Sequence, residues 1–283
     1  ANMSVNVQHN PDLLCIQVDD PVASYEYTNW YKNAYTGYSE DCSGYIVEMT
    51  YVPDDNFEQA LINRGLDFGP LNDSVPIIGI KSLINLDVSN SSIYDLTGIE
   101  DFENIEVLNC NLNNIEFLDL SKNTELLELS CYYNKLATLD LQSNLKLTKV
   151  DCQSNPLVSI NLSNNTNLEY LNCAYCQLTN LNIQNNDKLI TFSAQKNPPL
   201  CILVNNIESA ESKVQWYIDD WANYSLDCSG HNAEKIYLPD DNFENALISM
   251  GFDFWAPDDS VYKAIAETFT SLLIYNNNIK SLE

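Results

Sequence analysis

Four cysteines recur in one local context in the middle of the chain, spaced evenly (131 − 110 = 21 residues). They are Cys110, Cys131, Cys152 and Cys173, in the segments VLNCN, ELSCY, KVDCQ and YLNCA. A set of four thiolates is typical of structural zinc, whose sulfur ligands lie about 4 Å apart. On neighbouring strands ~4.8 Å apart, the first and last thiols of this series would be ~14 Å apart. The spacing therefore predicts a ladder of thiols that pack as small apolar side chains.

The remaining cysteines indicate different chemistry. Cys15 and Cys42 bracket the same interval as Cys201 and Cys228, in two segments of similar sequence. We predict the disulfides Cys15–Cys42 and Cys201–Cys228, each stabilising by about 3–4 kcal/mol through loop closure. Disulfides imply an oxidising compartment and hence export. Cys176 stands where the repeated units carry asparagine and is predicted to be a free thiol of unassigned role.

The cysteines lie inside a repeat with the pattern LxxLxCxxNxLxxLxLxxNxx. Four units follow one another from Ile105, and divergent units begin at Leu83 and Leu189. Self-similarity at this period is the signature of a leucine-rich repeat solenoid. The alternation in LxLxC predicts a short strand in each unit, and stacked units form a parallel sheet on the concave face. The predicted fold is a β-rich solenoid of 21-residue repeats with helical N-terminal caps and disulfide-closed C-terminal caps.

Two series of asparagines mark the turns of these units. The ninth-position series comprises Asn113, Asn134, Asn155 and Asn197, and the second series comprises Asn123, Asn144, Asn165 and Asn186. An amide side chain both donates to and accepts from backbone groups in a turn. We interpret both series as structural.

A longer repeat spans whole modules. The segment YVPDDNFEQALINRGLDF from Tyr51 returns as YLPDDNFENALISMGFDF from Tyr237, and Trp30 returns as Trp216. The chain is therefore interpreted as a piece of a tandem array. The predicted parts are a C-terminal repeat and cap (1–42), a linker (43–50), a complete module (51–228), a linker (229–236), and the cap and first repeat of the next module (237–283). Within the complete module we expect an N-cap (51–82), repeats (83–197) and a C-cap (198–228).

The N-cap sequence predicts a helix. Asp54 or Asp55 can cap its N-terminus, Phe57, Ala60 and Leu61 form an apolar stripe, and Gly65 can end it in the left-handed conformation. Such a helix would cover the exposed edge of the first repeat. The C-cap is predicted to be irregular or helical, with a buried tryptophan.

The caps and repeats together resemble a known family. The segments VPDDNFEQAL, LNCxxNxLxxLDLSxN and NPDLLCIQVDD…NW…C are similar to leucine-rich repeat proteins among the secreted and cell-surface proteins of Flavobacteria and related Bacteroidetes. The resemblance covers nearly the whole chain. It implies a secreted or cell-surface interaction or adhesion protein and names no ligand.

Composition excludes several classes of partner. The chain has 40 acidic and 13 basic residues and a net charge of −27, so a nucleic acid or an anionic membrane would be repelled. No run of 18 or more apolar residues occurs, so no membrane insertion is expected. The N-terminal residues ANMSVNVQHN do not form a signal peptide, which is expected of an excised fragment. The oligomeric state is left open.

The sequence contains no recognisable catalytic motif. The two histidines, His9 and His231, lie in no triad or metalloprotease context, and no glycine-rich phosphate loop occurs. We therefore predict no enzymatic activity and no cofactor. Pairs of aspartates such as Asp54–Asp55 and Asp240–Asp241 are attributed to helix capping, with weak Ca²⁺ binding as the alternative.

The outward residues of the strands form the surface on which a solenoid recognises a ligand. Tyrosine is common in binding hot spots, and here it is accompanied by amide and charged groups. The predicted binding site on the concave face consists of Glu128, Tyr132, Tyr133, Lys149, Asp151, Gln153, Tyr170 and Tyr175. The predicted function is recognition of a protein or a glycan. The alternative is a structural spacer with no ligand of its own.

Overall fold

The computed structural model describes most of the chain. The described ranges are 4–8, 15–24, 30–32, 36–43, 47–67, 69–231, 233–253, 257–274 and 277–280. His9 and residues 44–46 of the first predicted linker lie outside them. No helix within these ranges has the length and apolar character needed to cross a membrane.

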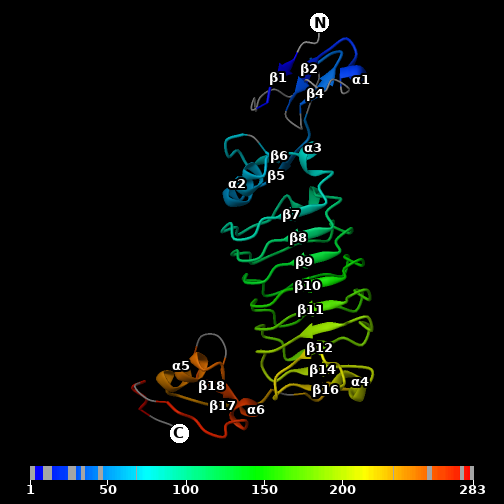
Figure 1. The fold of residues 1–283 in the computed structure, drawn as a ribbon. Coiled ribbons are helices and arrows are strands. Elements are labelled where there is room, and N and C mark those ends of the chain that lie inside the picture. Colours follow the sequence, from blue (N-terminus) through cyan, green and yellow to red (C-terminus); the bar gives the residue numbers. More distant parts are fainter. Residues whose placement is uncertain are drawn as a thin grey trace.

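A seven-stranded parallel sheet runs along the molecule and is called the main sheet below (Figure 1). In spatial order its strands are β7 (Asn85–Asp87), β8 (Val107–Asn109), β9 (Glu128–Ser130), β10 (Lys149–Asp151), β11 (Tyr170–Asn172), β13 (Thr191–Ser193) and β15 (Trp216–Tyr217). Equivalent residues of successive units are aligned, so that Lys149 pairs with Glu128 on one side and with Tyr170 on the other. Each unit thereby places its outward side chains beside those of its neighbours.

A second, smaller sheet lies on the other side of each unit. It consists of β12 (Asn180–Asn182), β14 (Cys201–Leu203) and β16 (Asn223–Ser225), all parallel. In earlier units the same segment forms only isolated bridges, Asp95 to Phe117 and Asp140 to Asn161. One hydrophobic core, continuous from Val52 to Ala210, fills the space between the two sides. The inward leucines and the ladder cysteines are buried in it.

The asparagine series fix the turns. The Asn134 Nδ2 donates to the carbonyl oxygens of Cys110 and Cys131, both at 3.0 Å, and its Oδ1 accepts from Ile115 N at 3.0 Å. In the second series Asn144 Nδ2 donates to the carbonyl oxygens of Leu120 and Asn123. Each amide thus joins two successive units, because buried backbone groups must be bonded.

The N-cap combines a hairpin with helices. It contains β5 (Met49–Tyr51), antiparallel to β6 (Ser74–Pro76), then α2 (Asp55–Asn63) and α3 (Ile77–Ile80), and a 3-10 turn, η1 (Ile99–Asp101), follows in the first repeat. Asp54 is the N-cap of α2, and Gly65 follows the helix with φ 70°. Phe57, Ala60 and Leu61 are buried, as the stripe predicts.

The segment from Lys235 to Ala266 repeats this arrangement. Its elements are β17 (Lys235–Tyr237), antiparallel to β18 (Ser260–Tyr262), α5 (Asp241–Ser249) and α6 (Lys263–Ala266), around a separate core. The strands β5 and β17 begin inside the two segments predicted to be linkers. Thr50 is buried, because the hairpin packs one side of β5 inward. Met49, Thr50, Lys235 and Ile236 therefore pair within these two hairpins.

The C-cap differs from the irregular or helical cap expected. It has one short helix, α4 (Ile207–Glu211), but it also adds β15 to the main sheet and β14 and β16 to the second sheet. The Trp216 side chain is half-buried and packs edge-on against Phe192, with ring centroids 5.4 Å apart. The alternation of residues in these segments, not recognised in the sequence, extends both sheets beyond the last repeat.

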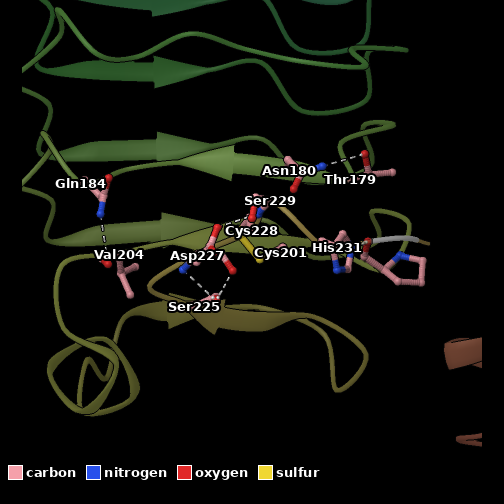
Figure 2. Close-up of a disulfide and its surroundings, with 11 residues drawn as sticks. Thr179, Asn180, Gln184, Cys201, Val204, Ser225, Asp227, Cys228, Ser229 and His231 are labelled. Carbon is pink, nitrogen blue, oxygen red and sulfur yellow. Dashed lines mark hydrogen bonds between the residues drawn. A yellow bond between two sulfur atoms is a disulfide. The ribbon is translucent and has the colours of Figure 1, made fainter.

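Disulfides are present in both equivalent caps. Figure 2 shows the Cys201–Cys228 bond, which ties β14 to the segment after β16. The Cys15–Cys42 bond joins the corresponding part of the first cap. There β1 (Val5–Asn6) pairs with β3 (Trp30–Tyr31), β2 (Cys15–Gln17) pairs with β4 (Gly37–Ser39), and α1 spans Pro21–Ser24.

Candidate binding surface on the main sheet

Three of the predicted site residues form a row across the main sheet. Glu128 on β9, Lys149 on β10 and Tyr170 on β11 are direct neighbours in the register. Lys149 Nζ lies 3.2 Å from Glu128 Oε2 and 5.9 Å from the centre of the Tyr170 ring. Because the ion pair is solvent-exposed, it adds little stability. The row can instead offer an aromatic ring and both signs of charge to a partner.

A second row lies two residues further along the same strands. Asp151 on β10 stands between Ser130 and Asn172, and Asn172 Nδ2 donates to Gln153 Oε1 at 3.0 Å. Burial raises the pKa of Asp151 above its ordinary value. Burial and the nearby Asp151 raise the pKa of Tyr170. This second row therefore consists of polar side chains, and Asn172 and Gln153 are hydrogen-bonded to each other.

The residues after the strands form a column on left-handed backbone. Leu112, Tyr133 and Tyr175 have φ values of 55°, 53° and 53°, and the equivalent residues Asn90, Ser154 and Lys196 are also left-handed. For a residue other than glycine or asparagine this conformation costs about 1–2 kcal/mol. The side chains of Tyr133 and Tyr175 are nevertheless 55% and 53% exposed. The sequence pattern placed these tyrosines on the face but did not reveal the backbone conformation.

The two tyrosines of the segment ELSCYYN contact each other. The Tyr132 and Tyr133 rings pack edge-to-face with centroids 5.8 Å apart. Tyr132 is half-buried, and Tyr133 N donates to Gln153 O of the next unit. Tyr132 thus supports the exposed ring of Tyr133.

Two residues at the same repeat position as Tyr132 are buried. Asn111 and Ala174, in the same column as Tyr132, are 6% and 5% exposed. The Asn111 Nδ2 donates across the sheet to Ser130 Oγ at 3.4 Å, so its side chain lies along the surface. Leu112, which is 46% exposed beside this column, belongs to the surface although it was not among the predicted site residues. Its signal in the sequence was its place in the repeat, one residue after the column of Tyr132.

The ladder thiols lie behind this surface, inside the core. All five free cysteines are buried. Burial raises the pKa of the Cys110 thiol to about 12 and raises the pKa of Cys131 and Cys173 as well. The thiolate form, which binds metals and reacts with oxidants, is therefore disfavoured at neutral pH.

Cys176 takes the place of a turn asparagine. Its Sγ lies 3.6 Å from the carbonyl oxygens of Cys152 and Ala174, which correspond to two of the carbonyls that Asn155 Nδ2 contacts, Cys131 O and Gln153 O. The Cys176 thiol and burial together raise the pKa of Cys152. Cys176 is thus part of the packing, a role that the sequence did not assign to it.

The two N-caps each gather three carboxylates that could hold a cation. In one, ligand oxygens of Asp55, Glu58 and Asp73 lie within 4.8 Å of one another, and Asp241, Glu244 and Asp259 repeat the arrangement. Glu58 is buried and its carboxylate accepts from Asn72 N and Asp73 N at 2.9–3.1 Å. These hydrogen bonds explain the buried acid without an ion.

The comparisons with known proteins point to one fold. No family model matches the chain. A segment of 74 residues is 39% identical to Internalin J of Listeria monocytogenes, covering 26% of this chain. Among solved structures, the functional domain of InlJ from L. monocytogenes, which includes a cysteine ladder, matches 65% of this chain with a TM-score of 0.53 and 26% identity. The chain is a leucine-rich repeat solenoid.

The similarity covers part of each relative. This leucine-rich repeat chain spans 8% of the length of Internalin J and 50% of the InlJ structure. The internalin InlF of L. monocytogenes matches 59% of this chain and 56% of its own, with a TM-score of 0.45 and 22% identity.

Proposed function

We propose that this leucine-rich repeat chain is a non-catalytic binding module that recognises a protein through the face of the main sheet. The observation that carries the proposal is the left-handed column of Leu112, Tyr133 and Tyr175. Bulky side chains there strain the backbone and remain exposed to solvent, so folding alone gives no reason for them. A partner that covers these side chains would be stabilised by burying apolar surface that the free chain leaves in solvent.

The size and chemistry of the face favour a protein partner. Six strands from β8 to β15, at ~4.8 Å spacing, give a width of about 24 Å, which suits a standard protein interface. Rigid tyrosines among amide and hydroxyl groups are also the composition of antibody binding sites. We propose that the other predicted site residues surround this contact: Glu128, Tyr132, Lys149, Asp151, Gln153 and Tyr170.

The setting of the module is part of the same proposal. We infer a secreted or cell-surface bacterial protein, since the two disulfides suit an oxidising compartment and a relative of part of the chain is an internalin. We also propose that the chain is divided into modules at 51–228 and 237–283, built from 21-residue units like those of Flavobacteria. The same proposal includes the absence of catalytic activity.

The test uses a change that removes the rings and relaxes the backbone. Asparagine occupies the column naturally at Asn90, which has φ 50°. The double variant Tyr133→Asn, Tyr175→Asn should therefore keep or raise the melting temperature. Binding to an array of purified cell-surface and matrix proteins should fall by at least about tenfold, the effect of losing a hot-spot residue.

The control variant is Phe117→Thr, which removes an exposed ring from the opposite face. It should leave protein binding unchanged. If the wild-type chain bound no protein on the array, the spacer interpretation would replace this proposal. Equal binding after the double substitution would show that the contact does not use the left-handed column, and would overturn the proposed site.

A further inference from the structure

The side of the solenoid opposite the main sheet carries a groove. Its volume is about 520 Å³, within the range of about 300–1,000 Å³ typical of small-ligand sites. It crosses three successive units at the segments that begin at Phe117, Thr138 and Ser159. The bridge between Asp140 and Asn161 holds two of these segments side by side.

The groove arises because side chains of different size occupy the same position in three successive units. Phe117 is 70% exposed, whereas the next units have Thr138 and Ser159 at the same place. The ring therefore forms a wall beside two small residues. Leu118 and Leu139, each 5% exposed, line the groove between these columns. An aromatic ring left in solvent gains nothing from the core, so its face is available for stacking.

The polar groups of the groove have unused bonding capacity. Asp140 Oδ1 accepts from Gln142 N at 2.9 Å, and Asn161 Oδ1 accepts from Ser163 N at 3.1 Å. Within the described part of the chain, no protein group bonds to Asp140 Oδ2, to Asn161 Nδ2 or to the side-chain amide of Gln142. The Thr138 and Ser159 hydroxyls complete a set with both donors and acceptors.

This combination selects the class of ligand. No lysine or arginine lines the groove, which disfavours an anion. A cation would bind the carboxylates of Asp119 and Asp140 but would leave the amide donors without partners. A sugar presents hydroxyls that both donate and accept, together with an apolar ring face that stacks on an aromatic side chain. We propose that this groove is a binding site for a neutral saccharide, with Phe117 under the ring and Asp140, Gln142 and Asn161 bonded to its hydroxyls.

The proposal does not depend on the protein-binding role of the main sheet. It is tested with neutral mono- and disaccharides of glucose, galactose, mannose and N-acetylglucosamine, by saturation-transfer NMR and calorimetry on the full chain. At least one sugar should bind. Phe117→Thr, which copies the next unit, should weaken that binding by about tenfold through loss of stacking.

A second substitution tests the polar side of the groove. Asp140→Asn copies Asn161 and keeps an oxygen for the turn, so it should fold normally. It removes the charged acceptor and should weaken sugar binding by roughly tenfold. Tyr133→Asn should leave the affinity for the sugar unchanged.

Three results would overturn the proposal. One is the absence of binding by every sugar in the panel. Another is binding that survives Phe117→Thr and Asp140→Asn but is lost in Tyr133→Asn, which would place the sugar on the main sheet. The third is binding of a lysine-rich peptide, but of no sugar, that depends on Phe117 and Asp140.

Discussion

At the scale of single residues, Cys176 shows what the turn asparagines contribute. An asparagine at this place donates to two carbonyl oxygens and also accepts from a backbone N–H of the preceding unit, as Asn155 does from Leu136 N at 3.0 Å. The Cys176 thiol contacts the carbonyls, but it offers no oxygen to Leu157 N, the equivalent donor. The third hydrogen bond of the turn is therefore missing in this unit.

Cys176→Asn should restore that hydrogen bond. The side chains are of similar size, so the free energy of unfolding should rise by about 1 kcal/mol. Urea denaturation of the two proteins measures the difference. The reverse change, Asn155→Cys, is the matched control and should lower stability by a similar amount. A loss of stability in Cys176→Asn would show that the thiol packs better than an amide at this place.

Asp151 gives a prediction about pH. Burial, its largest influence, raises the pKa of Asp151 above the ordinary value of 3.8, so the folded state holds this proton more tightly than the unfolded state. The free energy of unfolding contributed by this group therefore falls as pH rises through the folded pKa. Asp151→Asn, which copies Asn172 in the next unit, should raise stability at pH 7 and have no effect well below pH 3.8. Equal melting temperatures of the two proteins at pH 7 would contradict this reasoning.

The sequence predicted which residues share a face, because that follows from alternation along a strand. It placed Glu128, Lys149 and Tyr170 together, and the register does so. It did not predict the left-handed backbone of Tyr133, because conformation at that position is imposed by the turn and not by the side chain. Nor did it predict that Asn111 lies flat against the sheet, which depends on the neighbouring Ser130.

At the scale of elements, Asp54 joins the cap helix to the first repeat. Its Oδ1 accepts from Asn56 N and Phe57 N at the start of α2, and its Oδ2 accepts from Tyr94 N and Asp95 N at 2.8 and 3.0 Å. The sequence predicted the capping role but not the second pair of bonds, which requires contact between segments 40 residues apart. In the next module Asp240 likewise caps α5 and accepts from Lys280 N at 2.6 Å.

Two substitutions separate the roles of Asp54. Asp54→Ser keeps a capping oxygen but loses the bonds to Tyr94 and Asp95, so it should cost about 1–2 kcal/mol. Asp54→Ala loses both and should cost about 1 kcal/mol more. Thermal or urea denaturation gives both values, with Asp55→Ala as the control. Equal costs for the serine and alanine variants would mean that the cap contributes nothing beyond the link to the repeat.

In the caps, the helix has a local sequence signal and the strands do not. The helix of the N-cap has a polar start, an apolar stripe and a glycine end, and all three are readable locally. The hairpin of β5 and β6 was not predicted, because its strands are three residues long and pair across the intervening helix. The second sheet was also missed, since it is regular only in the last units.

At the scale of the whole molecule, a solenoid is stabilised by contacts between neighbouring units, so its ends are where it opens. The core runs without interruption from Val52 to Ala210, and the C-cap covers its last unit. Within that cap, β14 pairs with β16, and the Cys201–Cys228 bond closes the loop that contains both β15 and β16. The disulfide therefore restrains the strands that end both sheets.

Replacing both cysteines by serine should lower the free energy of unfolding by about 3–4 kcal/mol, because the unfolded chain is no longer closed into a loop of this length. The loss should appear first at the C-cap. Hydrogen exchange should accelerate in β14, β15 and β16, while β8 and β9 keep their protection, since their neighbours are unchanged. The variant Cys15→Ser, Cys42→Ser is the matched control and should leave exchange in β14 to β16 unaffected. Uniform acceleration along the solenoid after loss of Cys201–Cys228 would instead show that the module unfolds as one cooperative unit, with the cap disulfide stabilising every repeat equally.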